Sequence, residues 1–132
     1  MHSIKGLAGV VLAAGLAAGA AGAQENLTAE TANAAGVPGT TVLTLGEVAS
    51  QAGIANIQVS TGQTLTNSIQ NTAEGKTDIT AAPFILPFLL ARGAGPFAAL
   101  GPEKGAELAS GLSVLYTYRF GVFTLSAFES SK

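Results

Sequence analysis

The stretch "TANAAGVPGTTVLTLGEVASQ", Thr31–Gln51, decides which fold the rest of the chain can adopt. It places a glycine-rich turn, Gly36-Val37-Pro38-Gly39, between a strand-like segment at 26–31 and a helix-like pattern that follows. A turn that leads from a strand into a helix presents backbone N–H groups, which suit an anion. The stretch therefore predicts one strand–turn–helix unit and raises the question of what that turn holds.

The helix of this unit is expected to begin near Thr40. Apolar residues recur with helical spacing between Val42 and Val48, as on one face of an amphipathic helix. Either Thr40 or Thr41 suits the capping position at its start, and Gly53 suits its end.

A second unit of the same kind follows. The segment 54–61 alternates like a strand, Gly62 allows a tight bend, and Thr64 is expected to cap a helix that runs to about Glu74. A third short strand is expected at 79–82. Strands that alternate with helices predict an α/β fold with a mostly parallel sheet, right-handed crossovers and flanking helices.

The last third of the chain is less regular. The segment 83–97 is strongly apolar and predicts a buried helix with Pro87 in its first turn, too short to span a bilayer. A long glycine-rich loop is expected at 91–107, with a helical turn near Ala98. Residues 112–128 are dense in strand formers and predict one bent strand or two, with a kink near Gly121.

The N-terminus has the pattern of a secretory signal peptide. A short basic start is followed by an apolar run, and Ala21-Gly22-Ala23 fits cleavage before Gln24. The alternative is an uncleaved membrane anchor, since the run nearly reaches spanning length. We therefore expect a signal peptide at 1–23, one partial α/β domain at 24–132, and a periplasmic location.

Composition narrows the chemistry that the chain can perform. The 132 residues carry a formal net charge of −2 and no basic run, so we expect no nucleic-acid partner. There is no cysteine, and the only histidine, His2, lies in the signal peptide. Without imidazole or thiol, a mature enzyme has few groups for general base or nucleophilic catalysis. We therefore expect no catalytic residues, no metal site and no cofactor.

Both turns follow strands that are expected to be parallel neighbours, so both would lie at the edge where open α/β sheets bind ligands. The first turn is neither a P-loop nor a G-x-G-x-x-G motif, because Thr40 and Thr41 follow its last glycine. Two helix N-termini with hydroxyl and amide side chains suit a small carboxylate. Arg119, within "LYTYRFGVF", is a candidate counter-charge, and a solvated strand position is its alternative.

Three segments together resemble a known family. "NLTAETANAAGVPGTT", "NIQVSTGQTLTNSIQNTAEGKTDITAAP" and "LSVLYTYRFGVFTLSAFESS" are similar, in order and spacing, to the TAXI-type solute receptors of TRAP transporters. In that family a Gly-rich turn follows the first strand, and a Thr-Gly stretch with a helical Asn follows the second. A Gly-x-x-Asp-Ile/Leu element comes next, matched here by Gly75 and Asp78.

The resemblance implies the first lobe of a type II periplasmic-binding-protein fold, with the second lobe absent. Without the strand that returns from that lobe, we expect an unfilled slot in the sheet. Such receptors bind small organic anions and deliver them to an integral-membrane permease. The residues that would bind the ligand are Asn33, Gly36, Thr40, Thr41, Thr61, Gly62, Thr64 and Asn67, with Arg119 as the counter-charge.

Two other functions remain open. One is a small secreted envelope protein with a structural or interaction role, in which both turns serve only as helix caps. The other is a hydrolase that uses Ser or Thr with a carboxylate, for which the chain lacks both a nearby histidine and a G-x-S-x-G elbow.

Overall fold

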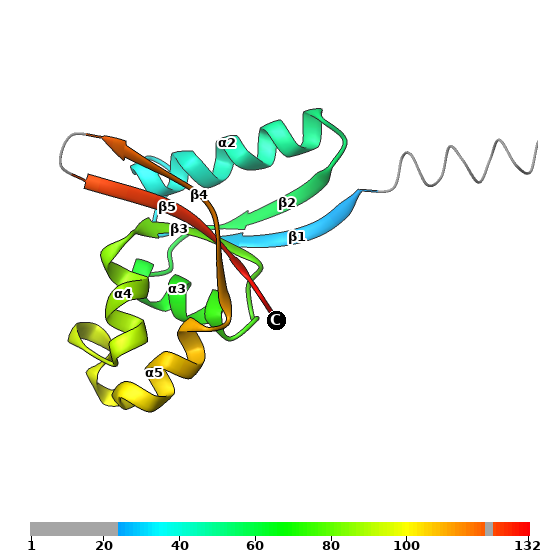
Figure 1. Cartoon of the computed structure of the whole chain (residues 1–132). Helices are drawn as coiled ribbons and strands as arrows, with labels where there is room; N and C mark the ends of the chain where they lie inside the picture. The colour runs from blue at the N-terminus through cyan, green and yellow to red at the C-terminus, as the bar shows by residue number, and fades with distance from the viewer. Residues whose placement is uncertain (1–23, 121–122) are drawn as a thin grey trace, which may run out of the picture.

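The computed structural model describes residues 24–120 and 123–132, and the predicted signal peptide at 1–23 lies outside them. One mixed sheet forms the centre of the molecule (Figure 1), with helices on both of its faces. Its strand order is β2-β1-β3-β5-β4. The strands are β1 (Glu25–Glu30), β2 (Ala55–Ser60), β3 (Ile79–Pro83), β4 (Leu112–Phe120) and β5 (Phe123–Ser130).

The first three strands are parallel, as the sequence predicts. β1 pairs with β2 on one side and with β3 on the other, both in parallel register. Helix α2 (Val37–Gln51) packs over one face of these strands, and helix α3 (Leu65–Ala73) packs against β3 and β5 on the other face (Figure 1). The chain thus alternates strand and helix from 25 to 83 and belongs to the α/β class.

Helix α2 begins three residues earlier than predicted. Its N-cap is Gly36, and Pro38 occupies the first turn, where the missing N–H of proline costs nothing. The N–H of Thr40 donates to the carbonyl oxygen of Gly36 at 2.9 Å, so Thr40 is already inside the helix. The expectation that Thr40 or Thr41 caps this helix is therefore wrong. Its expected end is confirmed, because Gly53 follows the C-cap with φ 70°.

Helix α3 agrees closely with the prediction. Thr64 is its N-cap, and its Oγ1 accepts a hydrogen bond from the N–H of Asn67 at 3.1 Å. Glu74 is its C-cap, and Gly75 follows with φ 78°. A threonine cap and a glycine stop define this helix by local chemistry alone.

The sheet is mixed rather than mostly parallel. β5 runs antiparallel to both β3 and β4, so residues 112–130 provide two strands, which is the second of the two expected alternatives. Because β5 lies between β3 and β4, the unfilled slot that the resemblance implied does not occur between these strands. The predicted kink at Gly121 falls outside the described residues.

The segment after β3 is mostly helical, both at 83–97, where a helix is predicted, and at 91–107, where a loop is predicted. It contains α4 (Ile85–Arg92), the 3₁₀-helix η1 (Gly95–Leu100) and α5 (Gly101–Ala109). Phe97 of η1 and Leu108 of α5 are buried with Leu90 in one core under the sheet. The helical turn predicted near Ala98 is confirmed as η1, but the long loop predicted around it is wrong: buried apolar side chains hold this segment in helices despite its glycines.

Helix α4 is less buried than predicted. Pro87 does lie in its first turn, but Leu90 is its only buried residue among those described, and Ile85 and Phe88 are 54% and 44% exposed. By length and composition alone, Ile85–Ala109 would also qualify as a membrane-crossing segment, with a mean hydropathy of 1.2. Here α4, η1 and α5 instead form a layer that covers one face of the sheet (Figure 1).

Two separate apolar cores lie on the two faces of the sheet. On the α2 face, Val42 packs with Ala29, Ile79 and Ala81. On the other face, Ile69 and Phe128 join the α4–α5 residues in a larger core.

Candidate functional site

The two predicted turns meet at the carboxyl edge of the parallel strands. The N–H of Gly62 donates to the carbonyl oxygen of Ala32 at 2.9 Å, and the N–H of Thr31 donates to that of Ser60 at 3.0 Å. Because the strand order is β2-β1-β3, the connection that follows β1 and the connection that follows β2 run to opposite faces of the sheet. The place where neighbouring connections diverge in this way is the topological switch point, where open α/β sheets bind ligands. The turns are thus neighbours, but the helices that follow them lie on opposite faces (Figure 1).

The first turn is closed by its own side chain. Asn33 Oδ1 accepts a hydrogen bond from the N–H of Gly36 at 2.6 Å. Gly39 packs against the backbone of Asn33 so closely that a Cβ there would overlap the Asn33 carbonyl oxygen. Within the described chain, no side chain caps α2 and no acidic residue lies in its first turn. The positive end of the α2 dipole is therefore not neutralised locally.

The second turn uses its polar groups internally. Gln63 Oε1 accepts hydrogen bonds from Asn67 Nδ2 at 3.1 Å and from the N–H of Thr64 at 3.2 Å. Thr64 Oγ1 is engaged as the helix cap. Thr61 and Gly62 are exposed beside them, and Gly62 has φ 97°. Of the residues predicted in this turn, Thr64 and Asn67 thus have a structural role that does not require a ligand.

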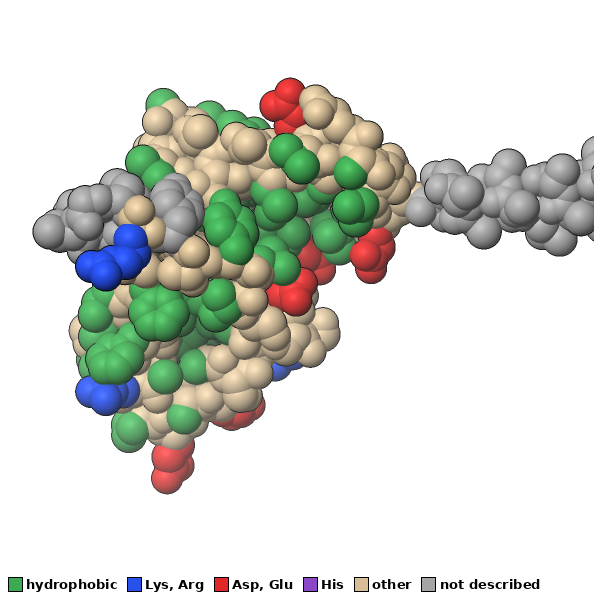
Figure 2. Space-filling model, turned by 45° about the horizontal axis from the view of Figure 1, so that its top comes forward, with side chains coloured by type: hydrophobic (Ala, Val, Ile, Leu, Met, Phe, Trp, Pro, Cys, Tyr) green, Lys and Arg blue, Asp and Glu red, His purple; other side chains and the backbone are tan. Residues whose placement is uncertain are grey.

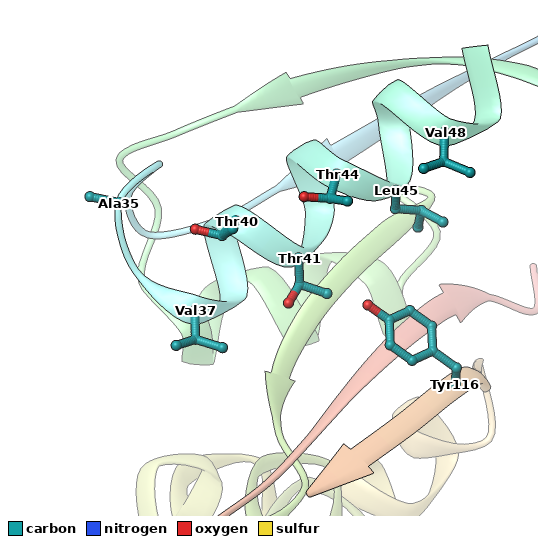
Figure 3. A pocket seen from close by; sticks show the side chains of 8 residues that line it. All are labelled: Ala35, Val37, Thr40, Thr41, Thr44, Leu45, Val48 and Tyr116. Atoms are coloured by element: carbon teal, nitrogen blue, oxygen red, sulfur yellow. The ribbon is translucent and has the colours of Figure 1, made fainter. Parts of the chain in front are cut away.

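A groove of about 450 Å³ lies between α2 and the β4–β5 hairpin. Figure 3 shows Tyr116 rising from β4 with its hydroxyl toward α2, and Thr41 and Leu45 facing it from the helix. The groove forms because α2 lies over β2 and β3 and leaves the edge strand β4 uncovered on this face. The lining residues are Ala35, Val37, Thr40, Thr41, Thr44, Leu45, Val48 and Tyr116.

The groove brings together only part of the predicted site. Thr40 and Thr41 line it, and the first turn leads into it at Ala35. Its lining residues include none of the second turn. Asn33 and Gly36 are not among them either, although both are within two positions of the lining residue Ala35 in the chain. Thr40 is exposed and Thr41 is buried, so the two hydroxyls meet different environments.

Arg119 lies away from both turns. It pairs with Thr124 near the end of β4, and β4 is separated from β1 by β3 and β5. Three strand spacings amount to roughly 14 Å. Strand alternation also places Arg119 on the face opposite to Tyr116, because these residues are an odd number of positions apart beyond the bulge. Arg119 therefore does not face the groove.

Sequence reasoning missed the apolar wall of the groove, which is formed by Tyr116 with Val37, Leu45 and Val48. The sequence pattern places Val37 in the turn because it predicts a helix start near Thr40, whereas the helix begins at Val37. Tyr116 lies 65 positions beyond the end of α2 in the chain and reaches that helix only through the strand order. The available signal was Pro38, since proline in a first helical turn places the start of the helix before it.

Two buried hydroxyls lie in or next to these elements. Thr31 Oγ1, directly after β1, and Ser68 Oγ, in α3, are buried and have no hydrogen-bond partner within the described residues. A buried hydroxyl without a partner carries a desolvation cost. Elsewhere, hydrogen bonds from Lys76 and then Gln70 lower the pKa of Glu74, at the far end of α3 from the turns.

In the part of the chain that the structure describes, no three His, Cys, Asp or Glu side chains gather in a way that could hold a metal ion. Comparisons with protein-family models, with curated proteins and with solved structures found no match to this chain.

Proposed function

We propose that this chain is a binding module for a small organic anion, with the ligand carboxylate at the N-terminus of α2. The observation that carries the proposal is that the first turn of α2, which has no acidic residue, leads directly into the groove opposite Tyr116. A helix N-terminus favours a negative group through its N–H donors and its dipole. The exposed hydroxyl of Thr40 adds a donor beside it.

The lining of the groove suggests the shape of the ligand. Thr40, Thr41 and Thr44 offer polar groups along α2, while Leu45 and Val48 follow toward its middle. An acid with a short apolar skeleton would therefore place its carboxylate near Val37 and its carbon chain between Thr41 and Tyr116, since Thr41 lies only about one helical turn beyond Val37. Because the groove is open on one side, much of such a ligand would stay in water and its affinity would be low.

The resemblance extends the proposal to a biological role. The chain would be the first lobe of a type II periplasmic-binding-protein fold, a TRAP-type solute receptor that delivers its ligand to a membrane permease outside the cytoplasm. The parallel order β2-β1-β3 and the contact between the two turns support this reading. A second lobe from the same or another chain would supply the missing side of the groove.

Isothermal titration calorimetry with acetate, succinate, isovalerate and phenylacetate tests the proposal. We expect saturable binding of at least one acid, which Thr40→Val weakens by about 1–3 kcal/mol if its hydroxyl is left unpaired against the ligand. Tyr116→Ala should weaken the apolar acids more than succinate, because it removes one wall of the groove.

Thr61→Val is the matched control, since Thr61 is an exposed threonine at the same edge but outside the groove. If Thr61→Val abolishes binding and Thr40→Val has no effect, the acid binds at the second turn and not in the groove. A folded protein that binds none of the four acids would contradict the proposal.

A second candidate is an interaction role without a small-molecule ligand. It is favoured by the exposed apolar side chains of Phe84, Phe88 and Val114, which surround a cleft on the other face of the hairpin. This role and the binding of an acid are separable, because they use different faces of β4.

A further inference from the structure

Strand β4 is an open edge of the sheet. It pairs only with β5 among the described strands, so its other side offers unpaired backbone groups. From Leu112 to Tyr118 it has no charged residue and no proline, the devices that usually protect an edge. Val114 and Tyr116 are 54% and 40% exposed on it. An edge of this kind is able to accept a further strand.

Each face of the sheet beside β4 carries an apolar depression. Tyr116 belongs to the groove under α2 on one face. On the other face, Leu112 and Val114 line a cleft of about 230 Å³ together with Phe84, Phe88 and Phe128. Successive side chains of a strand point to opposite faces. A strand added to β4 would therefore direct alternate side chains toward the two depressions.

The end of this edge is positively charged. Arg119 is exposed near the end of β4, and the ion pairs found among residues 24–120 and 123–132 join Lys76 to Glu74 and Lys104 to Glu107 instead. Arg92 lies over the ring of Phe88 at 4.1 Å, beside the cleft. Figure 2 shows hydrophobic side chains gathered on this side of the molecule, with Lys and Arg side chains at their margin.

We propose that β4 binds an extended segment of another protein by strand addition, and that this segment has apolar residues at alternate positions and an Asp or Glu that meets Arg119. Main-chain hydrogen bonds to β4 would supply affinity, and the two depressions and Arg119 would supply specificity. The bulge between Val114 and Tyr116 bends the edge, so regular pairing extends only over short runs on either side of it. The segment is therefore short.

Charge and shape select this occupant over two others. In a second copy of this chain, β4 would offer Arg119 no carboxylate, because the strand carries none. A flat lipid surface cannot fill depressions on both faces of one strand. A short acidic and apolar segment satisfies both the charge and the alternation.

Fluorescence anisotropy with labelled eight-residue peptides tests the proposal. Two of the peptides consist of alternating Thr and Val residues, with Glu at the first position in one and at the last position in the other. Two matched control peptides carry Lys in place of that Glu. We expect saturable binding of a Glu peptide, weakened about fivefold or more by Arg119→Glu, with the Lys peptide then bound better by that variant. Hydrogen exchange should show slower exchange of β4 amides in the complex.

Val114→Lys should abolish this binding by protecting the edge, whereas Ile54→Lys, at an even more exposed apolar site away from β4, should not. The charge swap remains informative even if Val114→Lys fails to fold. Absence of peptide binding to the folded chain, or binding that Arg119→Glu leaves unchanged, would overturn the proposal. A homodimer that Val114→Lys disrupts would also overturn the proposal, because the edge would then bind a second copy of this chain. Binding to phosphatidylglycerol vesicles that depends on Arg119, with no binding of the peptides, would overturn it in favour of a lipid surface.

Discussion

The two halves of the chain define their turns and helix ends by different means. In the parallel half, polar side chains close the turns: Asn33 accepts from Gly36, and Thr64 caps α3. In the α4–η1–α5 layer, none of the described helices has a side-chain cap, and glycines with positive φ, which the parallel half also uses, make the bends without one. The first half is therefore specified by local chemistry, while the second depends on burial of its apolar side chains in the core.

The largest effect is expected from the α4–η1–α5 layer. Phe97 is 1% exposed and packs with Leu90 and Leu108, so Phe97→Ala should lower the free energy of unfolding by about 3–5 kcal/mol. Phe88→Ala, at an exposed site on α4, should cost clearly less. Urea denaturation followed by circular dichroism measures both. Equal, small losses would mean that this layer is not held by its core.

A smaller effect is expected where α2 meets the first turn. A Cβ at Gly39 would overlap the backbone of Asn33, so Gly39→Ala should destabilise the chain by about 1–3 kcal/mol. Gly46 lies in the same helix with only ordinary contacts at its Cβ position, and Gly46→Ala should be neutral or stabilising. Thermal unfolding of the two variants distinguishes close packing from helix propensity. If both behave alike, the close approach of α2 to the turn is incorrect.

The N-cap of α3 should contribute about as much to the free energy of unfolding as an average helix cap does. Thr64→Ala removes the acceptor for the N–H of Asn67 and should cost about 1 kcal/mol. Thr61→Ala, three residues earlier and outside the helix, should leave the free energy of unfolding nearly unchanged. A large cost at Thr61, measured by the same urea titration, would show that the parallel half depends on more than its local caps.

The smallest effect concerns Glu74 and pH. Hydrogen bonds from Lys76 and Gln70 lower its pKa, so the folded state favours the carboxylate. The contribution of Glu74 to the free energy of unfolding is fully present above the pKa of the unfolded state, about 4.3. It is lost as the pH falls through the lower pKa that Glu74 has in the folded state. Glu74→Gln should therefore lower the free energy of unfolding by less than about 1 kcal/mol at pH 7, and the difference between the two proteins should shrink as the pH is lowered below about 4.3. A difference that grows toward low pH would contradict this sign.

The sequence predicted those elements whose signals are local. Thr64 and Gly75 mark the ends of α3, alternation predicts β2, and β1 and β3 are expected as short strands next to the predicted turns and helices. The α5 helix was missed because glycines surround it, although Pro102 and Glu103 in its first turn are start signals. The antiparallel position of β5 and the reach of Tyr116 to α2 depend on strand order, which no short window of sequence contains.

The most direct measurement of the proposed binding site is an NMR titration of the ¹⁵N-labelled chain with isovalerate and phenylacetate. Saturable shifts should centre on the amides of Val37 to Thr41 and on Tyr116, while β2 and α5 stay unchanged. Shifts centred on Thr61 to Asn67, or no saturable shift in a well-folded spectrum, would contradict a carboxylate site at the start of α2.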